Sequence, residues 1–340
     1  MRAAIVILNW NGKSFLEKFL PSVIQHSAHI ARIIVADNAS TDGSVAFLNE
    51  HYPNIELIVN QQNGGFATGY NQALQKVDSE FYILLNSDID ISGTWIEPVL
   101  GLLDTDSNIA AVQPKIRSYH QPEKFEYAGA AGGFIDAFGY PFCRGRLFQH
   151  LEVDNGQYNN NTEVFWATGA CMFIRSKDFW EVGGFDDDFF AHMEEIDLCW
   201  RLKNAGKKIM VCPQSVVYHI GGGTLPKNSW KKTYLNMRNN NIMLLKNLPK
   251  RKLIPIFASR FLLDAIASFK FLLDGGFKDL WAVVRAHSSF WGTIGTTLQK
   301  RWKSQRHPVS CVYHGNIVFD YFILGIRTFD QLKPNRFKKQ

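Results

Sequence analysis

The most restrictive feature of the sequence is a regular alternation of short apolar runs with stretches that have helical spacing. The apolar runs lack polar alternate positions, which is typical of strands buried on both faces of a sheet. They comprise residues 3–8, 32–37, 55–59 and 81–86, and the helical stretches comprise residues 14–26, 40–48, 63–77 and 95–104. This βαβαβαβ order predicts an α/β fold, with a mostly parallel sheet and helices on both faces.

Polar motifs stand where three of these apolar runs end. They are Asn9-Trp-Asn-Gly12, Asp37-Asn38 and Asn86-Ser-Asp-Ile-Asp90. In a sheet of this kind, ligands bind beyond the carboxyl ends of the strands. The first motif is not the G-x-G-x-x-G of a dinucleotide fold, and no P-loop is present. Carboxylates cannot hold a diphosphate directly because like charges repel, so the acidic motif predicts a divalent cation between the two.

Composition excludes several protein classes. A chain of 340 residues with 46% hydrophobic and 20% charged side chains is not disordered, and it suffices for one large domain or two ordinary ones. Its five cysteines include no C-x-x-C pair, which argues against a zinc ribbon or a disulfide framework and favours a reducing compartment. The first residues do not resemble a signal peptide, and no run of about 18 apolar residues is free of charge, so we expect no membrane-spanning helix.

Charge divides the chain into two parts. Residues 1–225 hold 16 basic and 26 acidic side chains, whereas residues 226–340 hold 21 basic and 5 acidic ones. We therefore expect a first domain over residues 1–225 and a basic helical extension over residues 226–340. Residues 253–273 predict a helix that is apolar except at Arg260, Asp264 and Lys270. Such a helix lies on an anionic membrane surface or packs on the core. No nucleic-acid-binding module is present, so nucleic acid is not an expected partner.

Six motifs together resemble family 2 glycosyltransferases of the GT-A fold, and most closely the rhamnosyltransferase-like branch. In chain order they are Asn9-Trp-Asn-Gly12, VADNASTDGS (35–44), NGGFATGYN (63–71), LNSD (85–88), GGFD (183–186) and EEIDLCWR (194–201). The resemblance covers about residues 2–245. It implies inverting transfer of a sugar from a nucleotide-diphosphate sugar, assisted by Mg²⁺ or Mn²⁺.

The resemblance assigns nucleotide-sugar binding to the strand ends, the Gly-rich turn and a later segment. The residues are Asn9, Trp10, Asp37, Asn38, Gly64, Gly65, Asn71, Asn86, Ser87, Trp166, Gly169 and Ala170. In that family an acid at the place of Asp37 hydrogen-bonds the base of the nucleotide. The residues also allow plainer interpretations: Asp37 as a turn residue, Trp10 as core, and the two glycines as a turn that needs a positive φ.

The metal site implied by the resemblance consists of Asp88, Asp90 and His219. The acidic pair of this motif is either Asp88 with Asp90 or Asn86 with Asp88, so Asp88 is a ligand in both cases. Asp90 is alternatively a turn residue. Asn86 stands where the stricter family pattern has an acid, which leaves less negative charge on the cation. Oxygen ligands suit Mg²⁺ or Mn²⁺, and an imidazole favours Mn²⁺. His219 is expected in a loop after a strand at residues 208–212, or it is simply structural.

The catalytic residues implied by the resemblance are Glu194, Glu195 and Asp197, at the start of a predicted helix. The family pattern here is Glu-Asp-x-Asp, in which the second acid is the general base, and Glu195 occupies that place. Glu194 remains the alternative base. Acids in a first helical turn also suit the helix dipole, and Asp197 has the spacing to pair with Arg201.

Two further regions are assigned to substrate. Residues 129–146 are rich in glycine and aromatics and lack clear periodicity, so we expect an acceptor-side loop with Asp136 and Arg144 as candidates. Lys227, Lys231 and Arg238 either neutralise the leaving diphosphate or are surface charge.

The expected enzyme moves a UDP- or dTDP-linked sugar to a glycan or lipid-linked saccharide in cell-surface polysaccharide synthesis. We expect it in the cytoplasm, peripherally bound to the inner face of the cell membrane. The alternatives are a non-catalytic nucleotide-sugar-binding scaffold and a nucleotidyltransferase on a similar sheet. The latter fits poorly, because the turn after the first strand lacks a Gly-rich, basic loop.

Overall fold

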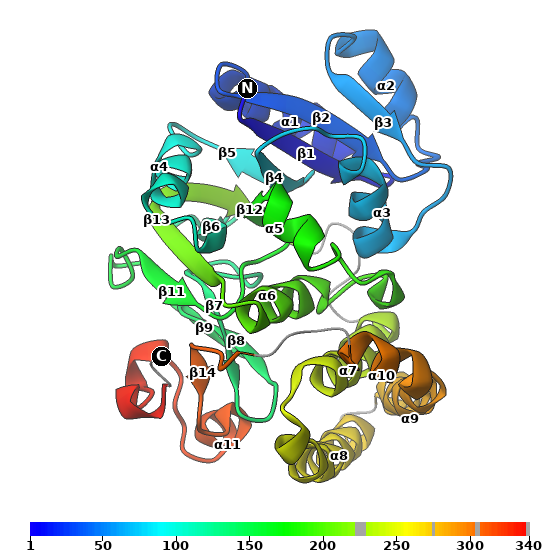
Figure 1. Ribbon diagram of the computed structural model, residues 1–340, viewed down its shortest axis with the longest axis vertical. Coiled ribbons are helices and arrows are strands. Elements are labelled where there is room, and N and C mark those ends of the chain that lie inside the picture. Colours follow the sequence, from blue (N-terminus) through cyan, green and yellow to red (C-terminus); the bar gives the residue numbers. More distant parts are fainter. Residues whose placement is uncertain (222–228, 274–275, 303–306, 338–340) are drawn as a thin grey trace.

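The fold is built on a mixed sheet that runs through the centre of the molecule (Figure 1). The computed structural model describes residues 1–221, 229–273, 276–302 and 307–337. Within them, nine strands form the large sheet, in the order β11-β13-β6-β12-β4-β1-β2-β3, with β5 paired to β13. The strands are β1 (Ala3–Asn9), β2 (Ala31–Asp37), β3 (Glu56–Val59), β4 (Phe81–Asn86), β5 (Ile89–Ile91), β6 (Ile109–Ser118), β11 (Thr162–Val164), β12 (Cys171–Arg175) and β13 (Lys208–His219).

The first four strands confirm the prediction from the apolar runs. β1 pairs in parallel with β2 and β4, and β2 pairs in parallel with β3. Only later strands reverse direction: β12 is antiparallel to β4 and β6, and β11 is antiparallel to β13. The carboxyl ends of β1, β2 and β4 therefore meet at one edge, which places their polar motifs together.

Helices cover both faces of this sheet, as expected. Alternate residues of β1 divide between two cores, because successive side chains of a strand point to opposite faces. Ile5 and Ile7 pack with α1, α2 and α4, whereas Ala4 and Val6 share the core of α3, α5, α6 and α7. These helices are α1 (Lys13–Ser27), α2 (Ser44–His51), α3 (Gly65–Leu74), α4 (Glu97–Thr105), α5 (Ser176–Glu181), α6 (Glu194–Asn204), which follows the short 3-10 helix η1 (Asp187–Phe189), and α7 (Trp230–Asn247).

The expectation of a loop over residues 129–146 is wrong. This region supplies strands to a second sheet, in the order β10-β9-β8-β7-β14. Its strands are β7 (Gly133–Asp136), β8 (Pro141–Cys143), β9 (Arg146–Leu147), β10 (His150–Leu151) and β14 (Val312–Tyr313). Asp136 is buried and accepts hydrogen bonds from the backbone N–H groups of Phe138, Tyr140 and Ile317, so its carboxylate holds the backbone together. Arg144 is also buried, and its guanidinium lies over the ring of Tyr158.

The C-terminal part is helical after β13, as the charge division predicted. It continues from α7 through α8 (Lys250–Leu273), α9 (Phe277–Gly292) and α10 (Ile294–Trp302), and ends with α11 (Ile317–Phe322), η2 (Phe329–Gln331) and η3 (Pro334–Arg336). No described helix is both long enough and apolar enough to cross a membrane. Side chains from α7 and α9, such as Met243, Leu244 and Phe290, belong to the same core as the large sheet. The expected boundary near residue 225 therefore does not separate two cores.

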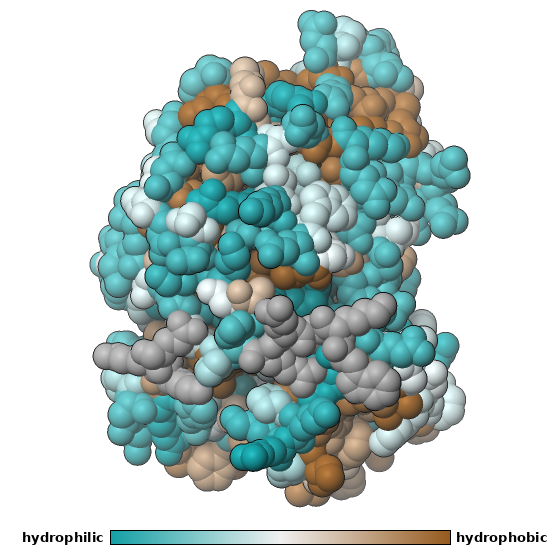
Figure 2. Space-filling view, viewed as in Figure 1, coloured by the Kyte–Doolittle hydropathy of each residue, from teal (hydrophilic) through white to brown (hydrophobic). Residues whose placement is uncertain are grey.

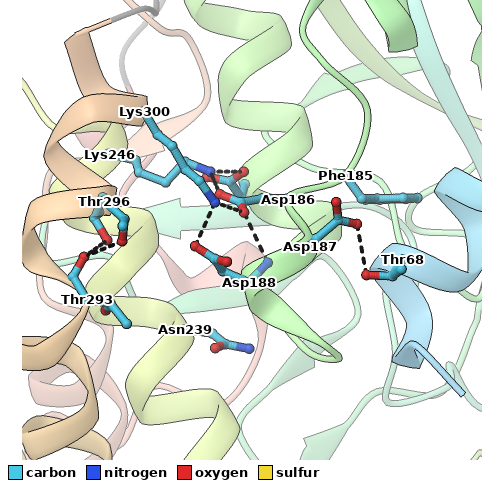
Figure 3. Close-up of polar contacts among 12 residues, drawn as sticks. Thr68, Phe185, Asp186, Asp187, Asp188, Asn239, Lys246, Thr293, Thr296 and Lys300 are labelled. Carbon is cyan, nitrogen blue, oxygen red and sulfur yellow. Dashed lines mark hydrogen bonds and ion pairs between the residues drawn. The ribbon is translucent and has the colours of Figure 1, made fainter.

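A buried ion-pair network ties the C-terminal helices to the sheet domain (Figure 3). The Lys246 ammonium, from α7, lies 2.5 Å from Asp186 Oδ2 and 2.8 Å from Asp197 Oδ2. Lys300, from α10, reaches Asp186 as well and lies 2.6 Å from Asp188. Burial would raise the pKa of Asp186, but the two lysines hold that pKa far below its ordinary value.

We expect Lys246→Met to lower the free energy of unfolding by about 3–5 kcal/mol, because it leaves two buried carboxylates short of a counter-charge. Urea titration monitored by fluorescence measures this change. Arg2→Met is the control, since it removes exposed ion pairs to Glu80 and Asp104 and should cost less than about 1 kcal/mol. Equal losses in the two variants would contradict the central role of the network.

Candidate active site

A buried triad of Asp88, His219 and Glu126 lies beside the carboxyl end of β4. Asp88 is in the turn between β4 and β5, and His219 is the last residue of β13, where it pairs with Ile89. His219 Nε2 lies 3.1 Å from Asp88 Oδ1, and His219 Nδ1 lies 3.0 Å from Glu126 Oε2. Burial alone would lower the pKa of His219, but the two carboxylates raise it to about 10.

The structure corrects the expected setting of His219. The strand that begins at Lys208 does not end at Cys212 but continues to His219, so the imidazole is held by the sheet rather than by a loop. Glu126 was not predicted at all. No sequence motif surrounds Glu126. Its backbone N–H donates to the Ile116 carbonyl oxygen of strand β6, and this contact places Glu126 beside His219. Gly221 keeps this place open, since a Cβ there would lie 2.6 Å from Glu126 Oε1.

The triad offers two ligands to a metal ion. Glu126 faces Nδ1 and leaves Nε2 on the side of Asp88, an arrangement in which a carboxylate orients a metal-binding imidazole. Among the described residues, no three His, Cys, Asp or Glu side chains converge as a metal site. Asp88 and His219 thus fit a cation that takes its remaining ligands from water and phosphate oxygens, as Mg²⁺ and Mn²⁺ commonly do.

Asp90 does not join this pair. Its Oδ1 accepts a hydrogen bond of 2.9 Å from Ser22 Oγ of α1, and its backbone pairs with Tyr218 in the sheet. The carboxylate is therefore directed at α1. The structure favours a structural role for Asp90 rather than that of a metal ligand.

The acidic start of α6 contains two carboxyl groups with free oxygen atoms. Glu194 is only 4% exposed, and neither its Oε2 nor that of Glu195 finds a hydrogen-bond partner among the described residues. Burial raises the pKa of Glu195 to about 7, although nearby backbone N–H groups oppose the shift. Burial raises the pKa of Glu194 well above its ordinary value, and the adjacent Glu195 raises it further. Such a pair is suited to proton transfer near neutral pH.

Asp197, the third predicted acid, is fully occupied by protein partners. Its carboxylate accepts hydrogen bonds from Arg201 Nε, Lys246 Nζ and Asn247 Nδ2, each at 2.8 Å, and it is fully buried. The pairing with Arg201 considered from the spacing is therefore present. Asp197 fixes α6 in place and leaves no oxygen free for a reactant.

The loop before α6 is strained. Phe190, His192 and Met193 all have positive φ angles, of 61°, 70° and 73°, which non-glycine residues rarely adopt. The buried Asn239 amide, from α7, holds this loop by donating to the carbonyl oxygens of Phe189, Ala191 and His192 at 2.8–2.9 Å. His192 Nε2 has no hydrogen-bond partner among the described residues, and burial lowers the pKa of His192 to about 4. Neither His192 nor Asn239 carried a sequence signal.

The polar residues at the ends of β1 and β2 contact one another. Asn9 Nδ2 donates to Asp37 Oδ2 at 2.9 Å, and Asp37 Oδ1 accepts from the Ser40 backbone N–H at 2.8 Å. Asn9 Oδ1 is buried without a partner among the described residues, whereas Trp10 is 42% exposed and so is not core. Asp37 thus has the contacts of a turn residue, Trp10 is open to a ligand, and Asn9 Oδ1 is unpartnered among the described residues but buried.

The Gly-rich turn and its helix contact a distant part of the chain. Gly65 has a φ of 74°, and a Cβ there would lie 2.3 Å from the Phe190 carbonyl oxygen, so this place requires glycine. Asn71 exchanges hydrogen bonds with the backbone of Phe185. Asn38 Nδ2 donates to the Gly65 carbonyl at 2.9 Å. The motif residues Asn38, Gly64, Gly65 and Asn71 therefore join α3 and β2 to the segment that precedes α6.

The segment over residues 166–170 links the triad to α6. The Ala170 carbonyl accepts from the Asn86 backbone N–H at 3.0 Å, two residues before Asp88. At the other end, the Ala167 backbone N–H lies 3.4 Å from Cys199 Sγ of α6. Trp166 is buried and donates to the Phe134 carbonyl, which makes it part of the core. Of the predicted binding residues in this region, Asn86 and Ala170 are joined by that backbone hydrogen bond, and Gly169 packs close to the Phe66 ring.

The predicted cationic residues have other contacts. Arg238 donates to the Asp188 carbonyl at 2.7 Å, and Lys231 Nζ lies 5.0 Å from the centre of the Phe190 ring. Lys227 lies outside the described residues.

Comparisons with known proteins agree on one family. A family model described as "Glycosyl transferase family 2" matches residues 4–183, more than half of the chain. An N-acetylglucosaminyl-diphospho-decaprenol L-rhamnosyltransferase of Mycobacterium tuberculosis is 26% identical over 233 residues, which cover 63% of this chain and 75% of the relative. The rhamnosyltransferase WbbL of Escherichia coli is 25% identical over 228 residues, which cover 63% and 82%.

Among solved structures, a similar one is a crystal structure of GalNAc-T7 with UDP, GalNAc and Mn²⁺. The TM-score is 0.59 at 17% identity, and the alignment covers 91% of this chain and 59% of that one. At this identity the likeness concerns the fold alone.

We expect Asn239→Ala to release the strained loop before α6, because three backbone carbonyls lose their donor, at a cost of about 1–3 kcal/mol. Hydrogen exchange of the amides of residues 190–193 should become faster. Asn240→Ala is the matched control, since that neighbouring buried amide donates to the Gly139 carbonyl instead. Equal exchange in both variants would show that Asn239 does not hold the loop.

Proposed function

Because the chain belongs to glycosyl transferase family 2, we propose that it transfers a UDP- or dTDP-linked sugar, with inversion, to a hydroxyl of a glycan or lipid-linked saccharide. The chain is a glycosyltransferase of GT-A fold, so the expected family, fold and enzyme class are confirmed. Its curated relatives include rhamnosyltransferases, one of them named for a decaprenol-linked substrate. The observation that carries the proposal is the free carboxylate of Glu195 at a site joined through residues 166–170 to Asp88 and His219.

Glu195 is the proposed general base. The acceptor hydroxyl attacks the anomeric carbon of the donor sugar while its proton passes to Glu195 Oε2, and the bond from that carbon to the diphosphate breaks. A direct displacement of this kind inverts the configuration. Glu194 is the alternative base, but burial and the adjacent Glu195 both raise its pKa well above the ordinary value, which disfavours its charged form.

Asp88 and His219 are the proposed protein ligands of Mg²⁺ or Mn²⁺, with Glu126 orienting the imidazole. A bound cation there would neutralise the negative charge of the departing nucleoside diphosphate. The imidazole ligand favours Mn²⁺ over Mg²⁺. Asn9 and Trp10 are the proposed contacts to the nucleoside.

The acceptor is proposed to be a lipid-linked glycan at the cytoplasmic face of a membrane, in the synthesis of a surface polysaccharide. The names of the curated relatives and the basic C-terminal region support this assignment. The chain would then contact the membrane peripherally.

We expect Mn²⁺ together with one of UDP, dTDP, GDP or CMP to raise the melting temperature of the protein, and Asp88→Ala to abolish this rise. Glu126→Ala should weaken Mn²⁺ binding about 10–100-fold, because the imidazole loses its orientation. Glu126→Gln is the control, since an amide oxygen still accepts from Nδ1. The nucleotide that stabilises the protein also identifies the donor. Failure of every nucleotide to stabilise it would contradict the proposed donor site, and binding without turnover would favour a scaffold.

We expect kcat/KM for sugar transfer to fall about tenfold per pH unit below pH 7, because Glu195, with a pKa of about 7, must be charged to accept a proton. Glu195→Gln should lower kcat about 10²–10⁴-fold. Glu195→Asp should retain part of the activity. If Glu194→Gln removed activity and Glu195→Gln did not, Glu194 would be the base.

A further inference from the structure

Three charged or titratable side chains of helices α8 and α9 are turned inward and contact one another. Arg260 and Asp264 of α8 are 2% and 1% exposed. The Arg260 guanidinium lies 3.8 Å from the centre of the Tyr140 ring and 3.5 Å from Asp264 Oδ1, and His287 of α9 lies 3.3 Å from Asp264 Oδ2. Two of the three charges that interrupt the apolar pattern of this helix, Arg260 and Asp264, are thus turned to the core, whereas Lys270 is exposed.

The outward faces of the same helices are apolar. Most of the exposed apolar residues of α8 are separated by one or two helical turns, which aligns them along one face. In α9 the spacing is the same. They are Ile254, Leu262, Ile266, Phe269 and Leu273 of α8 and Phe277, Trp281, Val284 and Trp291 of α9, and most are more than half exposed. Hydrophobic surface appears at the lower edge of the molecule in Figure 2, where Figure 1 places these helices.

Exposed basic side chains accompany this apolar face on the same two helices. Those exposed on α8 and α9 are Lys250, Arg251, Lys252, Lys270, Lys278 and Arg285. The two acids that the structure describes in these helices are engaged elsewhere: Asp264 is buried, and Asp279 accepts a hydrogen bond from Thr233. The exposed surface of these two helices is therefore both apolar and positively charged.

An exposed apolar face of this extent is costly in water, so an occupant is expected. A second copy of the chain would bring the same cations against one another, because a symmetric contact pairs a surface with itself. An anionic bilayer complements both kinds of side chain. The apolar side chains can pack among the acyl chains, and the lysines and arginines can pair with lipid phosphate groups. Tryptophan side chains favour the membrane–water interface.

We propose that α8 and α9 dock side by side on an anionic lipid bilayer, with the apolar residues of both helices in one leaflet. This inference rests on the proposed function, since it places the enzyme at the surface that holds a lipid-linked acceptor. Four further exposed apolar residues, Phe319, Phe322, Ile323 and Leu324, belong to α11 and the residues just after it, and Figure 1 shows α11 at the same end of the molecule as α8.

Flotation of the full chain with phosphatidylcholine vesicles that contain phosphatidylglycerol tests the proposal. The wild type should float with these vesicles. A variant with Leu262→Ser, Ile266→Ser, Phe269→Ser and Trp281→Ser should bind at least about tenfold less. Lys270→Glu with Lys278→Glu should also weaken binding about tenfold or more, and added salt should weaken that of the wild type.

Val59→Ser with Val153→Ser is the matched control, because these exposed apolar residues lie outside the face and should not affect flotation. A nucleotide-induced melting shift measured on every variant separates the two proposals, since it reports the donor site and does not depend on lipid. Docking is overturned if the wild type stays in solution, if the serine variant floats equally well, or if the wild type is a dimer that the serine variant dissociates.

Discussion

The structure depends on the buried contact between Lys246 and the carboxylates of Asp186 and Asp197. One ammonium group from α7 serves both the turn that precedes the strained loop and the first turns of α6. Because Arg201 and Asn247 occupy the rest of Asp197, this carboxylate cannot turn toward a reactant. The arrangement therefore separates two tasks among neighbouring acids: Asp197 fixes the helix, and Glu195 keeps a free oxygen.

Local sequence patterns predicted the large sheet and the position of its polar edge. Strands buried on both faces leave continuous apolar runs, and the residues that follow them lie at the ligand edge whatever the rest of the chain does. Asp88 and Glu195 could be proposed from motifs alone. Glu126, His192 and Asn239 could not, because their importance comes from contacts with residues distant in sequence, and nothing beside them in the chain indicates those contacts.

The wrong expectation over residues 129–146 has a physical origin. Residues 129–146 looked irregular because the strands they form are short and buried among aromatic side chains, so no alternation of polar and apolar positions develops. In α8 the pattern was visible, but a pattern does not say which face is turned inward. Arg260 is buried in contact with the Tyr140 ring and Asp264, and the apolar residues on the opposite side of the helix are therefore exposed.

The hydrogen bonds from Asn239 to the loop before α6 limit how the sequences of such chains can diverge. The family match ends at residue 183, yet the geometry of the acids at 194 and 195 depends on side chains from α7. A chimaera that exchanges C-terminal helices between relatives would thus also exchange the residues that hold the proposed catalytic acids, even if every motif residue were retained. The inner surface of the helical extension must therefore evolve together with the loop that Asn239 holds.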